Sequence, residues 1–346
     1  MVREQNKTAI VGIGYWGSTL LRNLVAIHGV SNVVAVDLDL NLLTSAYTEY
    51  PGLRTHRSLD EALADESITN VVVATPAASH FRLARQALEA GRHVYVEKPL
   101  ASNSVEAEEL CRIADACGRH LMVGHLMLFS PRVDKMRELV SSGQIGEVSH
   151  MSTQRLSLGR FRPDANVIWD LAPHDFSVIF HVLGEFPTKI QTAARADNGG
   201  DHPYVAFCNL WFPSGALANV TVSWLAPRKV RNMVVVGQDR MLQFDDAAAE
   251  EPVKIFDMGV ENGEQGAAVE PTYRQGDIIS PHVGSDQPVA RQLRHFRDAS
   301  MDLHPMISDG RFGVSVVKAL EAADLSWRSG GEPIEFAVEP PAIASI

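Results

Sequence analysis

A glycine motif near the start of the chain constrains the fold more than any other feature. It has the form G-x-G-x-x-G and is made by Gly12, Gly14 and Gly17. The apolar run 9–13 predicts a buried strand before it, and apolar residues at helical spacing over 16–27 predict a helix after it. A strand, a glycine turn and a helix in this order are typical of a dinucleotide site. An ordinary turn is the alternative explanation of the motif alone.

Each glycine would have its own role in such a site. Gly12 would permit the tight turn, Gly14 would let the backbone approach a pyrophosphate, and Gly17 would let helix and strand pack closely. The pyrophosphate would lie against the helix N-terminus, where backbone N–H groups have no partner within the helix.

A second apolar strand, 33–36, ends at Asp37, which follows Gly12 by 25 residues. A carboxylate near this spacing accepts a hydrogen bond from a ribose 2′-hydroxyl and repels a 2′-phosphate. The next residues, Leu38 and Asp39, add acid and no arginine. The predicted cofactor is therefore NAD, with NADP less favoured.

Composition limits the partners and the compartment. The 346 residues suggest two domains, at about 150 residues per domain. The net charge of −11 disfavours nucleic acid and anionic membranes as partners. Three cysteines and thirteen histidines show no metal-ligand spacing, and no run is apolar enough to span a bilayer or to form a signal peptide. We therefore expect a soluble cytoplasmic protein that binds no metal.

Residues 1–124 alternate between strand and helix patterns, which predicts a doubly wound parallel α/β sheet of the Rossmann type. Further strands are expected at 53–56, 70–74, 93–96 and 121–123, with helices at 41–50, 79–90 and 104–117 and a capping box at 58–61. Ligands of such sheets bind at the carboxyl ends of the strands, so the residues that follow each strand are the candidates for function.

Residues 125–346 predict a second, α+β domain. Helices are expected at 131–141, 167–183, 289–301 and 310–327, and several strands between 148 and 257 predict a mostly antiparallel sheet. Segment 259–285 shows no period and is interpreted as a loop that could contact another subunit. Helices would cover one face of the sheet and a partner subunit the other, which predicts a homodimer or homotetramer.

Lys98 follows the strand 93–96 and lies between Glu97 and Pro99. Pro99 favours an extended conformation for Lys98. A lysine at the mouth of a nucleotide cleft can hold a substrate hydroxyl or stabilise an alkoxide. A solvated surface lysine is the alternative.

Asp170 and His174 lie four residues apart and would share one helix face, although Pro173 suits only a first helical turn. The carboxylate could orient the imidazole, whose pKa suits general base catalysis near neutral pH. A histidine–aspartate pair that caps the start of a helix is the alternative.

Together these motifs resemble the Gfo/Idh/MocA oxidoreductase family, the glucose–fructose oxidoreductase and inositol dehydrogenase group, over nearly the whole chain. The resemblance rests on Gly12 to Gly17, Ala74-Thr75-Pro76, Glu97-Lys98-Pro99 and Asp170-x-x-x-His174. It implies a Rossmann domain followed by a domain with a large open sheet used in oligomerisation. It also implies that Lys98 and His174 lie by the reacting carbon, that Asp170 binds or orients, and that His80 lies near the nicotinamide.

The segments 123–131, 155–162 and 167–175 resemble members that oxidise nucleotide-activated sugars. The basic cluster Arg155, Arg160 and Arg162 could hold a diphosphate bidentately, or its members could pair with carboxylates. Asp170 departs from this subgroup, in which several members carry serine there, whereas polyol-oxidising members carry aspartate. The substrate class therefore stays open.

The sequence thus predicts an NAD(P)-dependent dehydrogenase that acts on a sugar secondary alcohol, most simply a nucleotide-activated one. A free polyol or aldose dehydrogenase and a dinucleotide-binding sensor without turnover are the alternatives. The predicted catalytic residues are Lys98, Asp170 and His174. The predicted cofactor-binding residues are Gly12, Gly14, Tyr15, Trp16, Gly17, Asp37, Thr75, Pro76, His80, Glu97 and Lys98. The predicted substrate-binding residues are Lys98, His125, Arg155, Arg162, Asp170 and His174.

Overall fold

The structure is a computed structural model, and it describes residues 7–159, 166–196, 200–248, 251–261 and 272–336. The chain forms two compact units. The first comprises 1–129, 286–318 and 341–346, and the second comprises 130–285 and 319–340.

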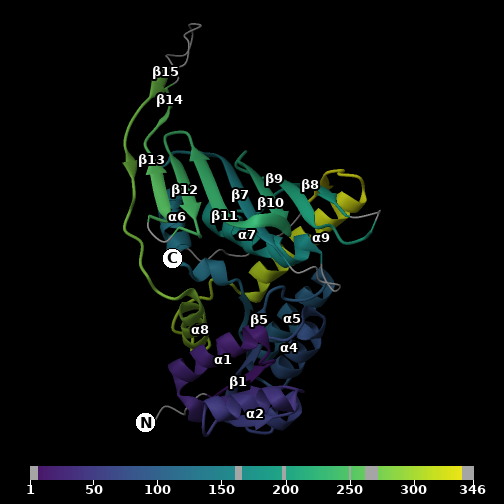
Figure 1. The fold of residues 1–346 in the computed structure, drawn as a ribbon. Coiled ribbons are helices and arrows are strands. Elements are labelled where there is room, and N and C mark those ends of the chain that lie inside the picture. Colours follow the sequence, from purple (N-terminus) through teal and green to yellow (C-terminus); the bar gives the residue numbers. More distant parts are fainter. Residues whose placement is uncertain (1–6, 160–165, 197–199, 249–250, 262–271, 337–346) are drawn as a thin grey trace. The chain divides into compact units, whose positions relative to one another are not determined.

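The first unit contains a six-stranded parallel sheet with strand order β3-β2-β1-β4-β5-β6 (Figure 1). Its strands are β1 Lys7–Val11, β2 Val33–Val36, β3 Arg54–His56, β4 Ile68–Val73, β5 His93–Glu97 and β6 Leu121–Gly124. Its helices include α1 Tyr15–His28, α2 Leu40–Glu49, α3 Leu59–Leu63, α4 His80–Glu89, α5 Ser104–Cys117 and α8 Pro288–Ala299. Every residue of β2 is buried, as expected for a central strand covered on both faces. The predicted Rossmann fold is confirmed.

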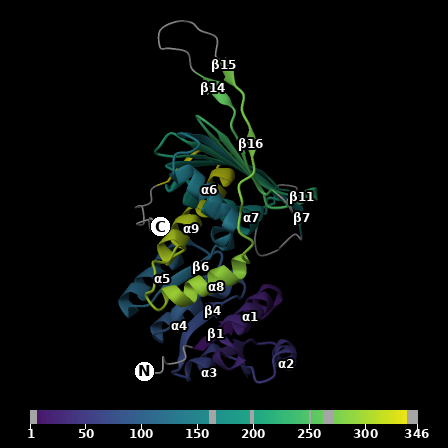
Figure 2. The same ribbon diagram turned by 90° about the vertical axis from the view of Figure 1, so that its left-hand side faces the viewer.

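Residues 286–318 group with the first unit, whereas the sequence-based division at 124/125 placed them in the second. The reason is packing. Tyr95 of β5 contacts the Phe296 ring of α8 at 5.9 Å between centroids, and its hydroxyl lies 3.1 Å from Gln292 Oε1. Val123 of β6 donates its backbone N–H to the Ser308 carbonyl oxygen at 2.8 Å. Figure 2 shows α8 within the same unit as α1 and β6.

The second unit is built on a nine-stranded sheet with strand order β16-β13-β12-β11-β7-β10-β9-β8-β17. Its strands are β7 Val148–Leu158, β8 Lys189–Arg195, β9 Val205–Trp211, β10 Leu217–Ser223, β11 Leu225–Gly237, β12 Met241–Asp245, β13 Val253–Phe256, β16 Ile278–Ile279 and β17 Ile334–Glu335. Only the β7–β10 pairing within it is parallel. The predicted large, mostly antiparallel sheet is confirmed.

Helices cover one face of this sheet. Helix α7, Val167–Leu183, packs on the central strands, and α6, Pro131–Ser141, packs on β12 and β13. Helix α9, Gly310–Arg328, belongs to the first unit up to Lys318 and to the second from Ala319. The inner side chains of the central strands, such as Cys208 and Val220, are fully buried. Alternate positions on the other face are exposed, including Phe207 and Leu217.

The prediction of a loop over 259–285 is wrong in part. Strands β14, Gly259–Glu261, and β15, Thr272–Arg274, form a two-stranded ribbon that extends beyond the sheet (Figure 1), and β16 pairs with β13. Residues 262–271 lie outside the described residues. Strands of two or three residues are too short to show a period-2 pattern, so the sequence carried no signal for them.

The three cysteines are free thiols. Within the part of the chain that the structure describes, no helix combines the length and apolar character that a bilayer crossing needs.

Candidate functional site

The glycine turn has the backbone that a dinucleotide site needs. Gly12 has φ +87°, a conformation that disfavours other residues, and a Cβ there would lie 2.7 Å from Thr75 Cγ2. A Cβ on Gly17 would lie 1.9 Å from the Gly12 carbonyl oxygen, so only glycine permits this approach of helix to strand. A Cβ on Gly14 would meet nothing within 4 Å, which leaves this stretch of backbone open to a ligand.

Helix α1 begins directly after Gly14, and no described side chain caps its N-terminus. Its first residue, Tyr15, is 96% exposed, and Trp16 is half-buried. The N-terminal N–H groups of a helix carry a partial positive charge that favours an anionic group such as a pyrophosphate. The turn and helix therefore fit the predicted cofactor.

Asp37 lies at the exit of β2 and holds the glycine turn directly. One carboxylate oxygen accepts a hydrogen bond from the Ile13 backbone N–H at 2.8 Å, and the other accepts one from the Asp39 N–H at 2.9 Å. The carboxylate is half-buried, so it retains accessible surface beside the turn. Its predicted role as a ribose acceptor fits this position.

The segment after β4 lies over the glycine turn and is held by His80. Thr75 contacts the Gly12 backbone region through its methyl group, while Pro76 is exposed. The buried His80 ring places Nε2 2.8 Å from the Thr75 carbonyl oxygen and Nδ1 2.7 Å from the Pro99 carbonyl oxygen. Burial lowers the pKa of His80. His80 thus connects the exits of β4 and β5, and its predicted place near the nicotinamide stays a prediction.

Glu97 connects the exit of β5 to helix α1. Its Oε1 accepts hydrogen bonds from Trp16 Nε1 at 2.8 Å and from the Tyr95 hydroxyl at 2.7 Å. Burial raises the pKa of Glu97, although these two donors and the nearby Lys98 charge oppose that shift. The Glu97 contact brings Lys98, the next residue, to the same edge of the sheet as the glycine turn.

Lys98 lies beside a buried histidine. His125, at the exit of β6, is 1% exposed, and no described protein group forms a hydrogen bond with either of its ring nitrogens. Burial first, and then the positive charge of Lys98, lower the pKa of His125 to about 3. His125 is therefore neutral at physiological pH. A buried polar group without a hydrogen-bond partner in the protein is unusual, and a bound water, an ion or a ligand atom can supply the missing partner.

Asp170 and His174 lie on one face of α7, as their spacing predicts. Asn166 is the N-cap of the helix, and its side chain accepts hydrogen bonds from the Ile168 and Trp169 N–H groups. The alternative that the histidine–aspartate pair caps the helix is therefore wrong. The helix also runs through Pro173, because burial of most of its residues offsets the lost hydrogen bond, a cost of about 3 kcal/mol.

Trp224 positions Asp170. Its indole Nε1 donates a hydrogen bond to Asp170 Oδ2 at 3.1 Å. The indole ring packs against Gly159, where a Cβ would lie 2.6 Å from the ring, and the Gly159 N–H donates to the Trp224 carbonyl oxygen at 2.9 Å. The hydrogen bond from Trp224 therefore holds the Asp170 carboxylate in one orientation. Trp224 was not among the site residues predicted from the sequence.

The structure supports carboxylate pairing for Arg155. Its Nε donates to Asp175 Oδ2 at 2.7 Å and its Nη2 to Oδ1 at 3.3 Å, and both side chains are almost fully buried between β7 and α7. Burial raises the pKa of Asp175, although Arg155 opposes that shift. A guanidinium held in this way is not available to a diphosphate, so Arg155 is a structural residue here. Arg160 and Arg162 lie outside the described residues.

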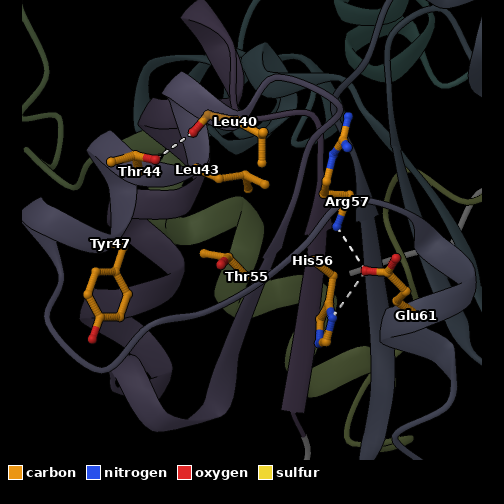
Figure 3. Close-up of a pocket in the computed structure, with 8 residues that line it drawn as sticks. All are labelled: Leu40, Leu43, Thr44, Tyr47, Thr55, His56, Arg57 and Glu61. Carbon is orange, nitrogen blue, oxygen red and sulfur yellow. Dashed lines mark hydrogen bonds and ion pairs between the residues drawn. The ribbon is translucent and has the colours of Figure 1, made fainter.

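A surface pocket of about 290 Å³ lies between α2, β3 and the start of α3 (Figure 3). Its lining residues are Leu40, Leu43, Thr44, Tyr47, Thr55, His56, Arg57 and Glu61. None of the predicted site residues lines it. It lies next to the β2 exit, because the Asp37 N–H donates to the His56 carbonyl oxygen at 3.2 Å.

The glycine turn, the uncapped start of α1 and the half-buried Asp37 of the first unit are together the features of a dinucleotide-binding protein. Residues 6–125 match the oxidoreductase family with an NAD-binding Rossmann fold, and residues 133–243 match the GFO/IDH/MocA C-terminal domain. The chain belongs to the Gfo/Idh/MocA oxidoreductase family. The predicted family, enzyme class and NAD-type cofactor are confirmed.

Two curated relatives show the range of this similarity. UDP-N-acetylglucosamine 3-dehydrogenase of Acidithiobacillus ferrooxidans is 26% identical over 242 residues, which cover 69% of this chain and 74% of that protein. The scyllo-inositol 2-dehydrogenase (NADP(+)) of Bacillus subtilis is 27% identical over 195 residues, which cover 51% of this chain and 52% of that protein. The chain thus matches about half the length of the second relative.

Solved structures show the same fold. The structure of GenD2 from gentamicin A biosynthesis, in complex with NAD, has a TM-score of 0.79 at 27% identity, covering 96% of this chain and 97% of that one. The Acidithiobacillus ferrooxidans dehydrogenase has a TM-score of 0.78 at 23% identity, covering 93% of this chain and 97% of that one.

Proposed function

We propose that this chain oxidises a secondary alcohol of a sugar with NAD, and that the reaction is reversible. The observation that carries the proposal lies in the first unit, where Lys98 and the neutral His125, whose ring nitrogens have no hydrogen-bond partner among the described residues, lie at the exits of β5 and β6. Glu97 joins this edge to the glycine turn through Trp16. A cation and a neutral imidazole beside a dinucleotide turn suit an alcohol that loses a proton and a hydride.

The residues of the glycine turn, together with Asp37, Thr75 and Glu97, would hold or support the cofactor. Bound NAD supplies a hydride acceptor. The alcohol oxygen loses a proton as the carbon loses hydride, so a base must take that proton. Lys98 and His174 are the candidate bases, and the cationic form of Lys98 would instead stabilise a developing alkoxide.

His125 and Asp170 would position the sugar. His125 is neutral and can donate from one ring nitrogen and accept at the other, as a hydroxyl requires. Asp170, whose direction Trp224 fixes, would accept a sugar hydroxyl or orient His174. Trp224 is a positioning residue, because it acts through Asp170.

A nucleotide-activated sugar is the favoured substrate class. The similarity to UDP-N-acetylglucosamine 3-dehydrogenase supports it, since that match covers 74% of the relative. The buried Arg155–Asp175 pair removes one of the three arginines that suggested a diphosphate site. A free polyol is the second candidate, supported by Asp170 and by the similarity to scyllo-inositol 2-dehydrogenase.

The test is the absorbance of reduced cofactor when the protein is mixed with NAD and a panel of substrates. The panel contains UDP- and dTDP-linked sugars, uronates and free polyols. Turnover of nucleotide-linked sugars alone would support the proposal, and turnover of free polyols alone would favour the second candidate. Tight NAD binding without turnover of any sugar would contradict both and favour a sensor.

A further inference from the structure

The arginine that directly follows β3 reaches the turn that contains Asp37. The Asp37 N–H bonds to the His56 carbonyl oxygen, which places the next residue, Arg57, beside the β2 exit. The Arg57 guanidinium Nη2 lies 3.5 Å from the carbonyl oxygen of Leu38, the residue after Asp37. The sequence that directly follows Asp37 contains no arginine, so only the fold brings this charge to the turn.

The Arg57 guanidinium is available to a ligand. The side chain is exposed, and within the described ranges it forms no ion pair. The nearest acid on its own segment, Glu61, accepts instead from the Arg57 backbone N–H at 3.1 Å and lies 3.6 Å from His56 Nδ1. Figure 3 shows the Arg57 side chain extending away from Glu61.

The acids at this turn are already partly satisfied. Asp37 accepts two backbone N–H groups, and Asp39 accepts the Asn41 N–H at 2.8 Å as the N-cap of α2. These donors offset part of the negative charge that a ribose phosphate would meet. An arginine near the ribose acceptor is the general means by which dinucleotide sites accommodate a 2′-phosphate. A guanidinium also matches phosphate geometry in a bidentate manner.

We propose that Arg57 recognises the 2′-phosphate of the adenosine ribose, so that this chain binds NADP as well as NAD, with NAD bound more tightly. The inference rests on the cofactor site of the proposed function and needs no particular sugar. The Asp37 carboxylate would repel the 2′-phosphate and so favour NAD, whereas Arg57 would attract the phosphate and reduce the difference between the two affinities.

The experiment is titration calorimetry of NAD and NADP, without any sugar, on the wild-type protein and Arg57→Gln. We expect wild-type protein to bind both dinucleotides. In Arg57→Gln the NADP affinity should fall about tenfold, as expected for loss of one charge-assisted contact of about 1.4 kcal/mol. The NAD affinity should stay within about twofold.

Arg54→Gln is the matched control. Arg54 is the first residue of β3, three positions before Arg57, and its guanidinium pairs with Asp65 at 2.8 Å. Its replacement removes the same charge and should leave the ratio of the two affinities unchanged. The loss in Arg57→Gln should also shrink at high salt, because an exposed ion pair is screened.

Three outcomes would overturn the proposal. Wild-type protein that binds NAD but not NADP would exclude a 2′-phosphate site. Equal losses for both dinucleotides in Arg57→Gln would mean that Arg57 only supports the Leu38 turn. Binding of neither dinucleotide would contradict the cofactor site itself, and thereby the proposed function, which the first two outcomes leave intact.

Discussion

Lys98 and His125 lie at the exits of the neighbouring strands β5 and β6 in the first unit. No described group forms a hydrogen bond with the His125 ring nitrogens, and Lys98 lies close enough to lower the pKa of His125. In the second unit, the indole N–H of Trp224 donates a hydrogen bond to Asp170. Under the proposed function, replacement of Lys98 or of Trp224 should therefore change the kinetics of the reaction.

Replacement of Lys98 by alanine should lower kcat by about 10² or more if Lys98 acts on the alcohol proton or the alkoxide. The measurement is steady-state kinetics with the substrate found in the panel. Lys98→Arg keeps the positive charge and serves to separate charge from proton transfer. An unchanged kcat with a raised KM would assign Lys98 to substrate binding alone.

Replacement of Trp224 by phenylalanine removes the donor to Asp170 and keeps most of the ring that packs on Gly159. A hydrogen bond to a charged group contributes about 1.5–3 kcal/mol, so kcat/KM should fall about tenfold or more. Trp327→Phe is the control, since Trp327 Nε1 donates to the Ala194 carbonyl oxygen at 3.2 Å instead. Equal effects of the two variants would show that Trp224 acts only on stability.

The glycine turn between β1 and α1 shows how closely these two elements approach. A Cβ on Gly17 would overlap the Gly12 carbonyl oxygen at 1.9 Å, whereas a Cβ on Gly14 would meet open space. Substitution of Gly17 therefore tests the packing of helix on strand, whereas substitution of Gly14 tests the approach of a ligand to the backbone.

We expect Gly17→Ala to lower the melting temperature and to abolish NAD binding, because the helix must move away from the strand. Gly14→Ala should melt close to the wild-type temperature and bind NAD more weakly, since the added methyl group enters the space of the ligand. Thermal unfolding and calorimetric titration of both variants check this. A Gly17→Ala protein of unchanged stability would contradict the packing argument.

Sequence patterns predicted those elements whose signal is local. The glycine turn, the Ser58 cap and the helix 167–183 all depend on residues within a few positions of one another, and the structure has each of them. Trp224 and Arg57 act on Asp170 and Leu38 across 54 and 19 residues, so no local pattern could reveal them. The sequence showed Arg155 as part of a basic cluster. Its partner Asp175 lies on α7 and could be identified only from the packing of α7 on β7.

At the scale of the whole molecule, six buried or half-buried histidines of the described residues link stability to pH. Chiefly because of burial, their pKa values are lowered from 6.5 to about 4 for His28, His93 and His295 and to about 3 for His125 and His181, and the pKa of His80 is lowered in the same direction. The unfolded chain therefore binds more protons than the folded chain below pH 6.5. Stability is full above that pH and falls as the pH drops towards 4.

Chemical denaturation at pH 7.5 and pH 5 should show a smaller free energy of unfolding at pH 5. His125→Gln should reduce this pH dependence, because it removes one of the groups that protonates on unfolding. His202→Gln is the comparison, since the His202 side chain is exposed in the folded chain. A free energy that is the same at both pH values would contradict the burial of these rings.

The uncovered face of the large sheet leads to a prediction about assembly. Phe207 and Leu217 are each 46% exposed on adjacent strands, on the face opposite α7. Charged residues there, as in Phe207→Glu with Leu217→Lys, should convert a homodimer or homotetramer to smaller species in light scattering after size exclusion. The control is Leu325→Glu, at an exposed position of α9. A wild-type monomer would contradict the prediction.

His80 has one further consequence. A neutral imidazole carries a single N–H, yet both of its nitrogens face carbonyl oxygens, those of Thr75 and Pro99, at 2.8 and 2.7 Å. Only one carbonyl can be bonded in a given tautomer, and the other oxygen then faces a lone pair. The carbonyl oxygens that follow β4 and β5 therefore compete for the single N–H of His80. A change of tautomer would move the hydrogen bond from one of these two segments to the other.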